Sequence, residues 1–376
     1  STKLALGNAD ARRITITIQP FVVTGRVTLG GTVAGAGTVT LEHREFQWRA
    51  GIVVAADGTF RAPMWQRGDF VCRVRTPALP SVFTQIAAIE DPARVIIDIP
   101  DGRVRGVVRD AKSGAPLSEA QVVLQTNTAD SEELVKLTTA REGTFDFIGV
   151  RHGRQKLRVL PPRHLEPDAI AFTLDDDAPL RDVDVRVDAG REVAVVVIDR
   201  ANDPIAGARV VCVSDGRICA RTTTNEDGRA EIAVPADQPA TLFAISKEGP
   251  FAMVRASREN GRLRIYLPAT SSSLQLRTRT TDGRTMPPFS LLMRFNGELV
   301  PAEVADELAA VQGLRLATGD DSDAQLRNIP SGSYEFWPYR TDEEAEAIVA
   351  AGALFPPIQV DVRAGENKVL VKFAAR

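Results

Sequence analysis

Residues 104–159, VRGVVRDAKSGAPLSEAQVVLQTNTADSEELVKLTTAREGTFDFIGVRHGRQKLRV, decide the fold of this chain. They contain short runs rich in β-branched residues, such as Val104–Val108 and Ala120–Leu124. Alternation of apolar and polar side chains within such runs predicts half-buried β-strands. The runs are separated by the turn stretches Ser113–Leu117 and Glu142–Gly143, in which glycine supplies a positive φ without steric cost. The stretch therefore predicts a small β-sandwich.

The same order of features returns three more times along the chain. The other copies begin near Gly25, Glu192 and Leu274, and the last of them is degraded. An Asp-Gly turn recurs in each of them, at residues 57–58, 227–228 and 282–283. The spacing of roughly 85 residues is too long for a solenoid unit and is typical of independent small domains.

The joints between the copies also repeat. Residues 94–102 and 182–190 each end one copy in a strand and lead into the next copy with almost no linker. We therefore expect an all-β chain of tandem immunoglobulin-like or prealbumin-like sandwiches in an elongated array. The expected domains are 21–101, 102–190, 191–270 and 271–376. Residues 1–20 end in a stretch similar to these joints, so they are either the closing strand of a preceding, missing domain or an N-terminal edge strand.

The last copy carries helical insertions. Pro301–Val311 has proline in its first turn, early acidic residues and apolar residues at helical spacing. Asp342–Ala351 is a second helical stretch with acidic residues in its first turn. Two roles stay open for these insertions: packing or capping of the sandwich, and binding of a partner.

The repeated pattern resembles the carboxypeptidase regulatory-like domain, a transthyretin-like (prealbumin-like) seven-stranded β-sandwich. Its signature is a strand ending in Gly-x-Val, an Asp, a Gly-x-Pro-Leu turn, Ala-x-Val and Thr-x-x-Asp-Gly-x-Phe. Residues 104–159 match it nearly throughout, with Glu142 in place of the aspartate, whereas residues 193–234 carry Ala230 in place of phenylalanine. The resemblance implies an architecture and brings no catalytic residues. It also implies a secreted, periplasmic or cell-surface bacterial protein.

The composition is that of a globular protein and argues against two classes of partner. The chain has 376 residues, of which 44% are hydrophobic and 25% charged, and its net charge is −3. Acidic and basic residues are mixed along it, so no basic stripe for nucleic acid is present. No apolar run approaches the ~20 residues that a membrane span requires.

Residues suited to catalysis are scarce. The three histidines, His43, His152 and His164, lie at no zinc-ligand spacing to one another. The sequence contains neither a Gly-x-Ser-x-Gly elbow nor a phosphate-binding loop. We therefore expect a protein that is not an enzyme and needs no cofactor.

Two acidic clusters are candidate calcium sites, because carboxylates gathered on loops can ligate calcium through oxygen. The alternative is a solvated turn that keeps a sheet edge from aggregating. The candidate ligands are Asp175, Asp176 and Asp177 in one cluster and Asp320, Asp321 and Asp323 in the other. Apart from these two weak candidates, no metal site is expected.

Two of the three cysteines, Cys212 and Cys219, flank a hairpin turn whose tip is Asp215-Gly216. A two-residue turn places position 212 opposite position 219, at about the Cβ separation that a disulfide requires. In that turn the pair is hydrogen-bonded, which is the less comfortable place for a bridge. A disulfide and two buried free thiols therefore both stay open. Cys72 is expected in the core.

Aromatic residues gather in the first and last copies. Exposed rings can stack on sugars, whereas inward rings belong to the core or to a domain interface. Alternation directs Tyr334 and Phe336 inward, but Trp337-Pro338-Tyr339 breaks the alternation and is expected to be partly exposed. The candidate ligand platform consists of Trp48, Trp65, Trp337 and Tyr339.

These features favour a non-catalytic extracytoplasmic protein that acts as a structural spacer or as a protein-interaction and adhesion module. The expected partner is another protein or a surface glycan, with strand addition at an exposed sheet edge as one mode of binding. The alternative is a carbohydrate-binding or accessory region of a larger secreted hydrolase. A neighbouring catalytic domain would favour the alternative.

Overall fold

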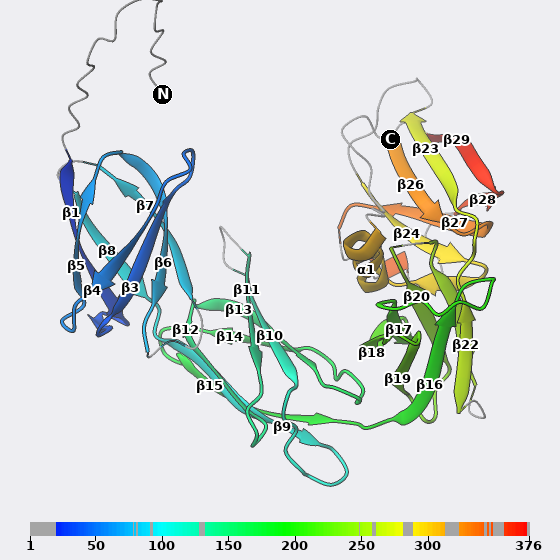
Figure 1. Cartoon of the computed structure of the whole chain (residues 1–376), viewed down its shortest axis with the longest axis horizontal. Helices are drawn as coiled ribbons and strands as arrows, with labels where there is room; N and C mark the ends of the chain where they lie inside the picture. The colour runs from blue at the N-terminus through cyan, green and yellow to red at the C-terminus, as the bar shows by residue number, and fades with distance from the viewer. Residues whose placement is uncertain are drawn as a thin grey trace, which may run out of the picture.

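The computed structural model describes residues 20–373 except 78, 80–81, 91–92, 128–131, 248, 258–260, 281–288, 313–322, 342–343, 346 and 349–356. Four pairs of β-sheets follow one another along the chain as a bent row (Figure 1). The helix α1 (Ala302–Gln312) accompanies the strands. The predicted all-β class with tandem sandwiches is therefore confirmed, and so is a helical insertion in the last sandwich.

The first sandwich has a sheet built around β1 and a second sheet of order β4-β3-β6-β7. β1 lies between β5, which is antiparallel to it, and β8, which is parallel, and β2 pairs with the end of β1. The strands are β1 (Phe21–Leu29), β2 (Thr32–Val33), β3 (Gly37–His43), β4 (Arg49–Val54), β5 (Thr59–Met64), β6 (Gly68–Arg75), β7 (Phe83–Ile89) and β8 (Ala93–Ile99).

The second sandwich repeats this arrangement. Its three-stranded sheet has the order β12-β9-β15, with β15 parallel to β9, and its four-stranded sheet has the order β11-β10-β13-β14. The strands are β9 (Gly102–Asp110), β10 (Gln121–Asn127), β11 (Glu132–Thr138), β12 (Thr144–Val150), β13 (Gly153–Leu160), β14 (Ile170–Leu174) and β15 (Leu180–Val187).

The third sandwich has the same topology, with the sheets β19-β16-β22 and β18-β17-β20-β21. Its closing strand β22 is again parallel to its first strand β16. The strands are β16 (Arg191–Ile198), β17 (Arg209–Ser214), β18 (Arg217–Thr223), β19 (Arg229–Val234), β20 (Ala240–Ile245), β21 (Ala252–Ala256) and β22 (Arg262–Tyr266).

The fourth sandwich consists of the sheets β26-β23-β29 and β25-β24-β27-β28, and α1 is inserted between β25 and β26. The second predicted helical stretch is only partly among the described residues, and residues 344–345 and 347–348 within it are helical. The strands are β23 (Ser272–Thr280), β24 (Ser290–Phe295), β25 (Glu298–Val300), β26 (Asp323–Ile329), β27 (Gly332–Tyr339), β28 (Ile358–Val362) and β29 (Gly365–Phe373).

Each sandwich pairs one small residue with one large residue at the same place in the sheet that contains its first strand. In the second sandwich Gly106 lies opposite Phe145, and a Cβ on the glycine would come within 2.7 Å of the phenylalanine ring. The third sandwich reverses the sizes, because Val195 lies opposite Ala230. The corresponding pairs in the other two sandwiches are Gly25–Phe60 and Leu276–Ala324. This exchange accounts for the alanine that interrupts the repeat at position 230.

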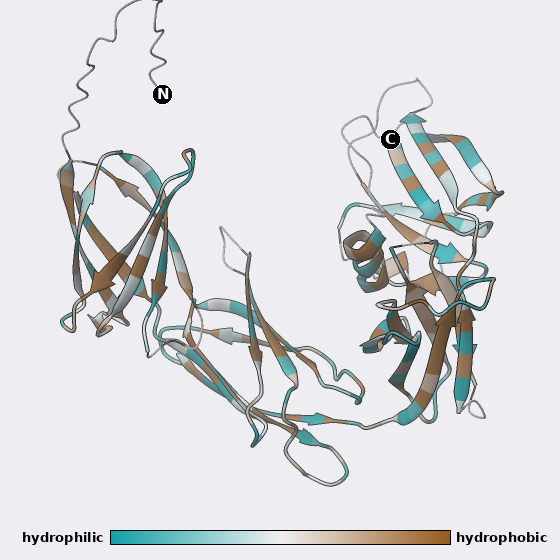
Figure 2. Ribbon diagram, viewed as in Figure 1, coloured by the Kyte–Doolittle hydropathy of each residue, from teal (hydrophilic) through white to brown (hydrophobic). Residues whose placement is uncertain are grey.

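The third and fourth sandwiches share a hydrophobic core. β17 and β20 are buried on both faces. One face contributes Cys212 and Leu242 to the core of the third sandwich, whereas the other contributes Val211 and Phe243 to a cluster with Leu308 of α1. Figure 2 shows hydrophobic residues along these strands. The two sandwiches therefore meet through an apolar interface rather than through their linker alone.

The joints between sandwiches are short. β8 ends at Ile99 and β9 begins at Gly102, and β15 ends at Val187 before β16 begins at Arg191. The closing strand of one sandwich thus continues almost directly as the first strand of the next. In the described part of the chain, no helix is long and apolar enough to cross a membrane.

Candidate functional site

A cluster of charged side chains lies where the second, third and fourth sandwiches meet. Arg221 on β18 forms ion pairs with Glu166, on the loop between β13 and β14, and with Glu307 on α1. Arg209 on β17 also pairs with Glu307. The side chain of Glu166 is 7% exposed and that of Arg221 is 20% exposed. These four residues, here named the junction cluster, connect three sandwiches through a single guanidinium at Arg221.

Hydrogen bonds reinforce the junction cluster on both sides. The backbone N–H of Glu166 donates to the carbonyl oxygen of Cys219 at 2.6 Å, which attaches the loop of the second sandwich to β18. From the fourth sandwich, the carboxylate of Glu303 accepts the N–H of Ile218 at 3.3 Å, and the side-chain amide of Gln312 donates to the carbonyl of Gly249 at 2.7 Å. The predicted helix at 301–311 is thus confirmed and packs on the neighbouring sandwich.

The electrostatics of the junction cluster are those of a structural joint. Burial raises the pKa of Glu166, although Arg221 and Arg158 act in the opposite direction. Burial and the nearby Glu303 and Glu307 likewise raise the pKa of Asp306. Carboxylates in this cluster face guanidinium groups at contact distance, so opposite charges neutralise each other. The arrangement holds elements together and presents no activated nucleophile.

A crevice of about 620 Å³ opens beside the junction cluster, between the loop at 162–164 and strands β16, β18 and β19. Arg163 on that loop lies 3.5 Å from Glu231 on β19. The next residue, His164, lies 3.6 Å from Asp110, and Leu165 packs against the core of the third sandwich. The loop therefore holds the second sandwich to the third.

The first and second sandwiches meet through a smaller set of contacts. The guanidinium of Arg151 donates to the carbonyl oxygen of Thr84 at 3.0 Å and lies 5.0 Å from the ring centroid of Phe83. Ile148 packs against the core of the first sandwich. Arg151 therefore makes both of these contacts with β7 of the first sandwich.

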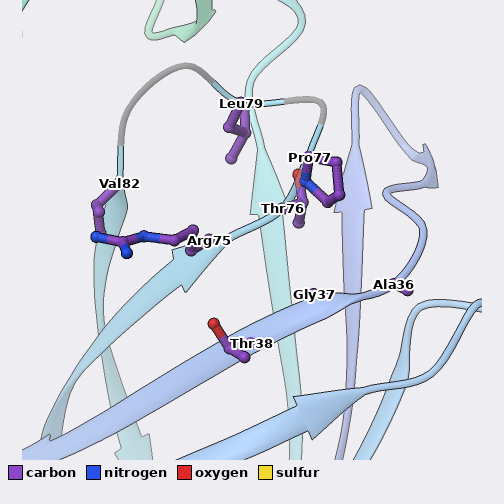
Figure 3. A pocket seen from close by; sticks show the side chains of 8 residues that line it. All are labelled: Ala36, Gly37, Thr38, Arg75, Thr76, Pro77, Leu79 and Val82. Atoms are coloured by element: carbon purple, nitrogen blue, oxygen red, sulfur yellow. The ribbon is translucent and has the colours of Figure 1, made fainter.

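The first sandwich also contains an open hollow of about 640 Å³, shown in Figure 3. It lies beside β3 and the end of β6, its lining includes Thr38 and Arg75, and the Arg75 side chain extends toward Val82. Arg75 is the single ionisable side chain among the eight lining residues. A lone guanidinium among short and apolar side chains supplies no acid–base pair.

The two acidic clusters are placed as follows. Asp175, Asp176 and Asp177 are exposed after β14. The carboxylate of Asp175 accepts the N–H of Ala178 at 2.8 Å, and Asp176 lies 2.7 Å from Nδ1 of His152.

In the second acidic cluster, Asp323 pairs with Arg277 and Arg279, whereas Asp320 and Asp321 lie outside the described residues. Among the residues that the structure describes, no group of three His, Cys, Asp or Glu side chains is placed to hold a metal ion. Calcium binding at either cluster stays a prediction.

The cysteine hairpin differs from its expected pairing by one residue. Asp215 and Gly216 both have positive φ and form the two-residue turn, but a β-bulge places Cys212 opposite Ala220 rather than opposite Cys219. The two Sγ atoms nevertheless lie 2.9 Å apart. Cys72 is fully buried as expected, and burial raises the pKa of its thiol to about 11.

The structure does not bring the four predicted platform residues together. Trp337 is buried, contrary to the sequence expectation. It packs with Leu292 and with Ile348 of the second helical stretch, while Tyr339 lies at the edge of the same cluster. The guanidinium of Arg294 lies 5.1 Å from the Trp337 ring.

The two tryptophans of the first sandwich differ in exposure. Trp48 is half-buried and packs edge-on to Phe70, with 5.7 Å between ring centroids, whereas Trp65 is 50% exposed. His43 connects the loops on which they lie, because its Nδ1 accepts backbone N–H groups at 3.1 and 3.3 Å and its Nε2 donates to the carbonyl of Arg67. The half-exposed Phe46 lies against the His43 ring, so exposed aromatic surface is present on these loops.

The sequence interpretation missed the junction cluster. Glu166, Arg221 and Glu307 are far apart in the sequence and belong to no motif, so no local pattern identifies them. An available signal was the nearly continuous apolar run in β17 and β20, because strands that are buried on both faces lose their alternation. Such runs indicate that another layer covers the sheet.

Comparison with solved structures gives distant likenesses. The Bacillus anthracis TIE protein is 11% identical, with 96% of this chain and 76% of that chain covered and a TM-score of 0.22. A streptococcal ancillary pilin is 10% identical over 66% of this chain and 99% of its own, with a TM-score of 0.24. The major pilin subunit of Bacillus cereus is 13% identical over 72% of this chain and 98% of its own, with a TM-score of 0.20. A comparison with curated protein sequences found no match.

One comparison concerns the second sandwich directly. Residues 103–188 match the family model of the carboxypeptidase regulatory-like domain, and this range begins in β9 and ends just after β15. The match covers the strands in which the repeat is most complete. The chain therefore contains a carboxypeptidase regulatory-like domain at residues 103–188, as one of four β-sandwiches in tandem.

Proposed function

We propose that the chain is a non-catalytic structural spacer that works outside the cytoplasm and holds an interaction surface in a fixed place. The observation that carries this proposal is the junction cluster, in which Arg221 pairs with residues of both neighbouring sandwiches. Domains joined in one chain move relative to each other unless a large apolar interface holds them. Here a shared core acts across the joint of the third and fourth sandwiches, and an ion pair and a backbone hydrogen bond act across the joint of the second and third.

The pairing and placement of charged residues support the proposal that the chain is not an enzyme. The charges at the junction are paired with opposite charges across sandwich boundaries. The hollow of the first sandwich contains Arg75 as its single ionisable side chain. The family match at 103–188 supports a location outside the cytoplasm, because such domains are typical of secreted and surface proteins. The proposed partner is another protein or a surface glycan.

Small-angle X-ray scattering of the full chain tests the spacer function. The double variant Glu166→Ala, Glu307→Ala removes the carboxylate groups that accept hydrogen bonds from Arg221 across sandwich boundaries. We expect a larger radius of gyration and a broader distance distribution than in the wild type, because the joints are loosened.

The matched control is Asp146→Ala, Asp182→Ala, which removes two carboxylate groups from ion pairs inside the second sandwich. It should leave the scattering unchanged. If both double variants scatter like the wild type, the junction cluster does not hold the joints, and the spacer proposal fails.

Carbohydrate binding is a second candidate function, supported by the half-exposed Trp65 and Phe46 on the loops that His43 connects. Rings held in place by a scaffold lose little conformational entropy when a ligand stacks on them. A glycan array with the wild type and Trp65→Ala tests this function. Binding by the wild type that is lost in the variant supports a sugar platform there. An array without hits for the folded wild type removes the candidate.

A further inference from the structure

Cys212 and Cys219 are in direct contact beneath the junction cluster. Their Sγ atoms are 2.9 Å apart, and the thiol of Cys219 also lies 3.4 Å from the carbonyl oxygen of Cys212. Both are free thiols in the structure. Cys212 is fully buried in the core of the third sandwich, whereas Cys219 is partly exposed. Cys219 therefore reaches the surface in part and touches a second cysteine that does not.

The β-bulge in this hairpin explains why the sulfurs meet. Val213 lies opposite Ile218, but Cys212 lies opposite Ala220, so Cys219 is the extra residue of the bulge. A bulge makes two residues of one strand oppose a single residue of the other and redirects their side chains. Cys219 and Ala220 therefore both lie opposite Cys212. The two cysteines are not held at the wider spacing of a regular hydrogen-bonded pair.

We propose that Cys212 and Cys219 are a dithiol that oxidises to a disulfide, and that this disulfide stiffens the hairpin on which the neighbouring sandwiches meet. The bond joins positions seven residues apart, across a turn that is already formed, so the fold needs little rearrangement. The inference does not rest on the spacer function, because it concerns the hairpin itself.

The proposed reaction needs an external oxidant, for which a small-molecule disulfide is sufficient. The thiol of Cys219 loses its proton to water, and its sulfur attacks one sulfur of the external disulfide, which releases one thiolate. Cys212 then loses its proton and attacks the sulfur of Cys219, which releases the second thiolate. Two protein thiols become one disulfide, and the external disulfide is reduced to two thiols.

The environment of the two thiols sets the order of these steps. The hydrogen bond with Cys219 and burial raise the pKa of the Cys212 thiol, so Cys212 keeps its proton longer. A thiol must be both deprotonated and accessible to attack an external disulfide. Cys219 is therefore the attacking residue, and Cys212 is the resolving residue.

The disulfide would fix the segment of β18 that the second and fourth sandwiches contact. The carbonyl of Cys219 accepts the N–H of Glu166, the N–H of Ile218 donates to Glu303, and Arg221 pairs with Glu166 and Glu307. A covalent bond at position 219 restricts the motion of the residues on either side of it. Oxidation should therefore be detected at the amide of Glu166, in another sandwich.

Thiol counting on the full chain tests the bond. The protein is incubated with glutathione disulfide or with dithiothreitol, unfolded in urea, alkylated with N-ethylmaleimide and weighed by intact mass spectrometry. We expect one alkylated cysteine after oxidation, which is Cys72, and three after reduction. Three alkylated cysteines after oxidation would overturn the proposal.

Single variants test the identity and order of the thiols. Cys72→Ala is the matched control, and it should show no alkylated cysteine after oxidation and two after reduction. Cys212→Ala should retain one glutathione on Cys219, because the resolving thiol is missing. Cys219→Ala should remain free of glutathione, because Cys212 is buried. Glutathione on Cys212 rather than on Cys219 would contradict the proposed order.

Hydrogen exchange and thermal unfolding test the stiffening. Closing a short loop restricts the unfolded chain, and the oxidised protein should melt about 5 °C higher than the reduced protein. Exchange at the amide of Glu166 should slow on oxidation in the wild type and in Cys72→Ala, but not in Cys212→Ala. If the disulfide forms but neither the melting temperature nor the exchange at Glu166 changes, the proposed stiffening of the junction is wrong.

Discussion

The carboxylate of Glu166, on a loop of the second sandwich, forms an ion pair with the guanidinium of Arg221 on β18 of the third sandwich. The two residues are largely buried, and Arg221 also reaches Glu307 of the fourth sandwich. Removing the arginine would leave two carboxylates without their main counter-charge. The contact between Glu166 and Arg221 is therefore the place where a single substitution acts on three sandwiches at once.

The variant Arg221→Ala should lower the free energy of unfolding by about 3 kcal/mol, because breaking a buried pair leaves uncompensated charge. The matched control is Arg186→Ala, since Arg186 is 69% exposed and lies 3.8 Å from Asp184 within one sandwich. The control should change stability by less than about 0.5 kcal/mol. Urea unfolding measures both, and equal effects would show that the junction pairs contribute no more than surface pairs.

Acidification should stabilise the wild type relative to Glu166→Gln. Burial raises the pKa of Glu166 above its unfolded value of about 4.3, so the folded protein binds this proton more tightly. The contribution is complete below the unfolded pKa and is lost as pH rises through the folded pKa. Urea unfolding of both proteins between pH 4 and about 7.5 measures it. A stability difference that stays constant with pH would contradict the raised pKa.

The size exchange between the second and third sandwiches predicts strong coupling between positions 195 and 230. Val195→Gly alone leaves a void, and Ala230→Phe alone overpacks the sheet, each costing about 1–3 kcal/mol. The double variant recreates the glycine–phenylalanine pair seen at Gly106 and Phe145. It should be more stable than the sum of the single effects by about 1 kcal/mol or more. Additive losses in a double-mutant cycle would show that the two positions are independent.

His43→Ala should loosen the loops that carry Phe46 and Trp65. The buried imidazole makes hydrogen bonds to two backbone N–H groups and to the carbonyl of Arg67, and the variant leaves these groups without that partner. We expect the free energy of unfolding of the first sandwich to fall by about 1–3 kcal/mol. Hydrogen exchange should rise at residues 45–48 and 65–67, with His164→Ala as the control. Unchanged exchange there would mean that packing alone holds the loops.

The sequence was sufficient to predict the sandwiches because their determinants are local. Alternating apolar residues and Asp-Gly or Glu-Gly turns act over a few positions, and they recur in every copy. The joints between sandwiches could be predicted for the same reason, because the strands that form them, such as β15 and β16, follow each other in the chain.

What lies between sandwiches depends on contacts that no local pattern encodes. Trp337 breaks the alternation of β27 and looks exposed in the sequence, but Ile348 of the helical insertion covers it. The hairpin turn at Asp215-Gly216 was readable, whereas the bulge that moves Cys219 out of register was not. The second buried face of β17 packs into a cluster that contains α1 and strands of the fourth sandwich, which follow much later in the sequence.

The parallel pairing of first and closing strands determines how each sandwich responds to tension along the chain. β9 is pulled at its start and β15 at its end, and the two strands lie side by side and run in the same direction. Opposed forces on such a pair load it in shear, so its evenly spaced hydrogen bonds must break together rather than one after another. The same geometry recurs in β1 with β8, β16 with β22 and β23 with β29. Each sandwich therefore resists a pulling force with all the hydrogen bonds of this strand pair at once.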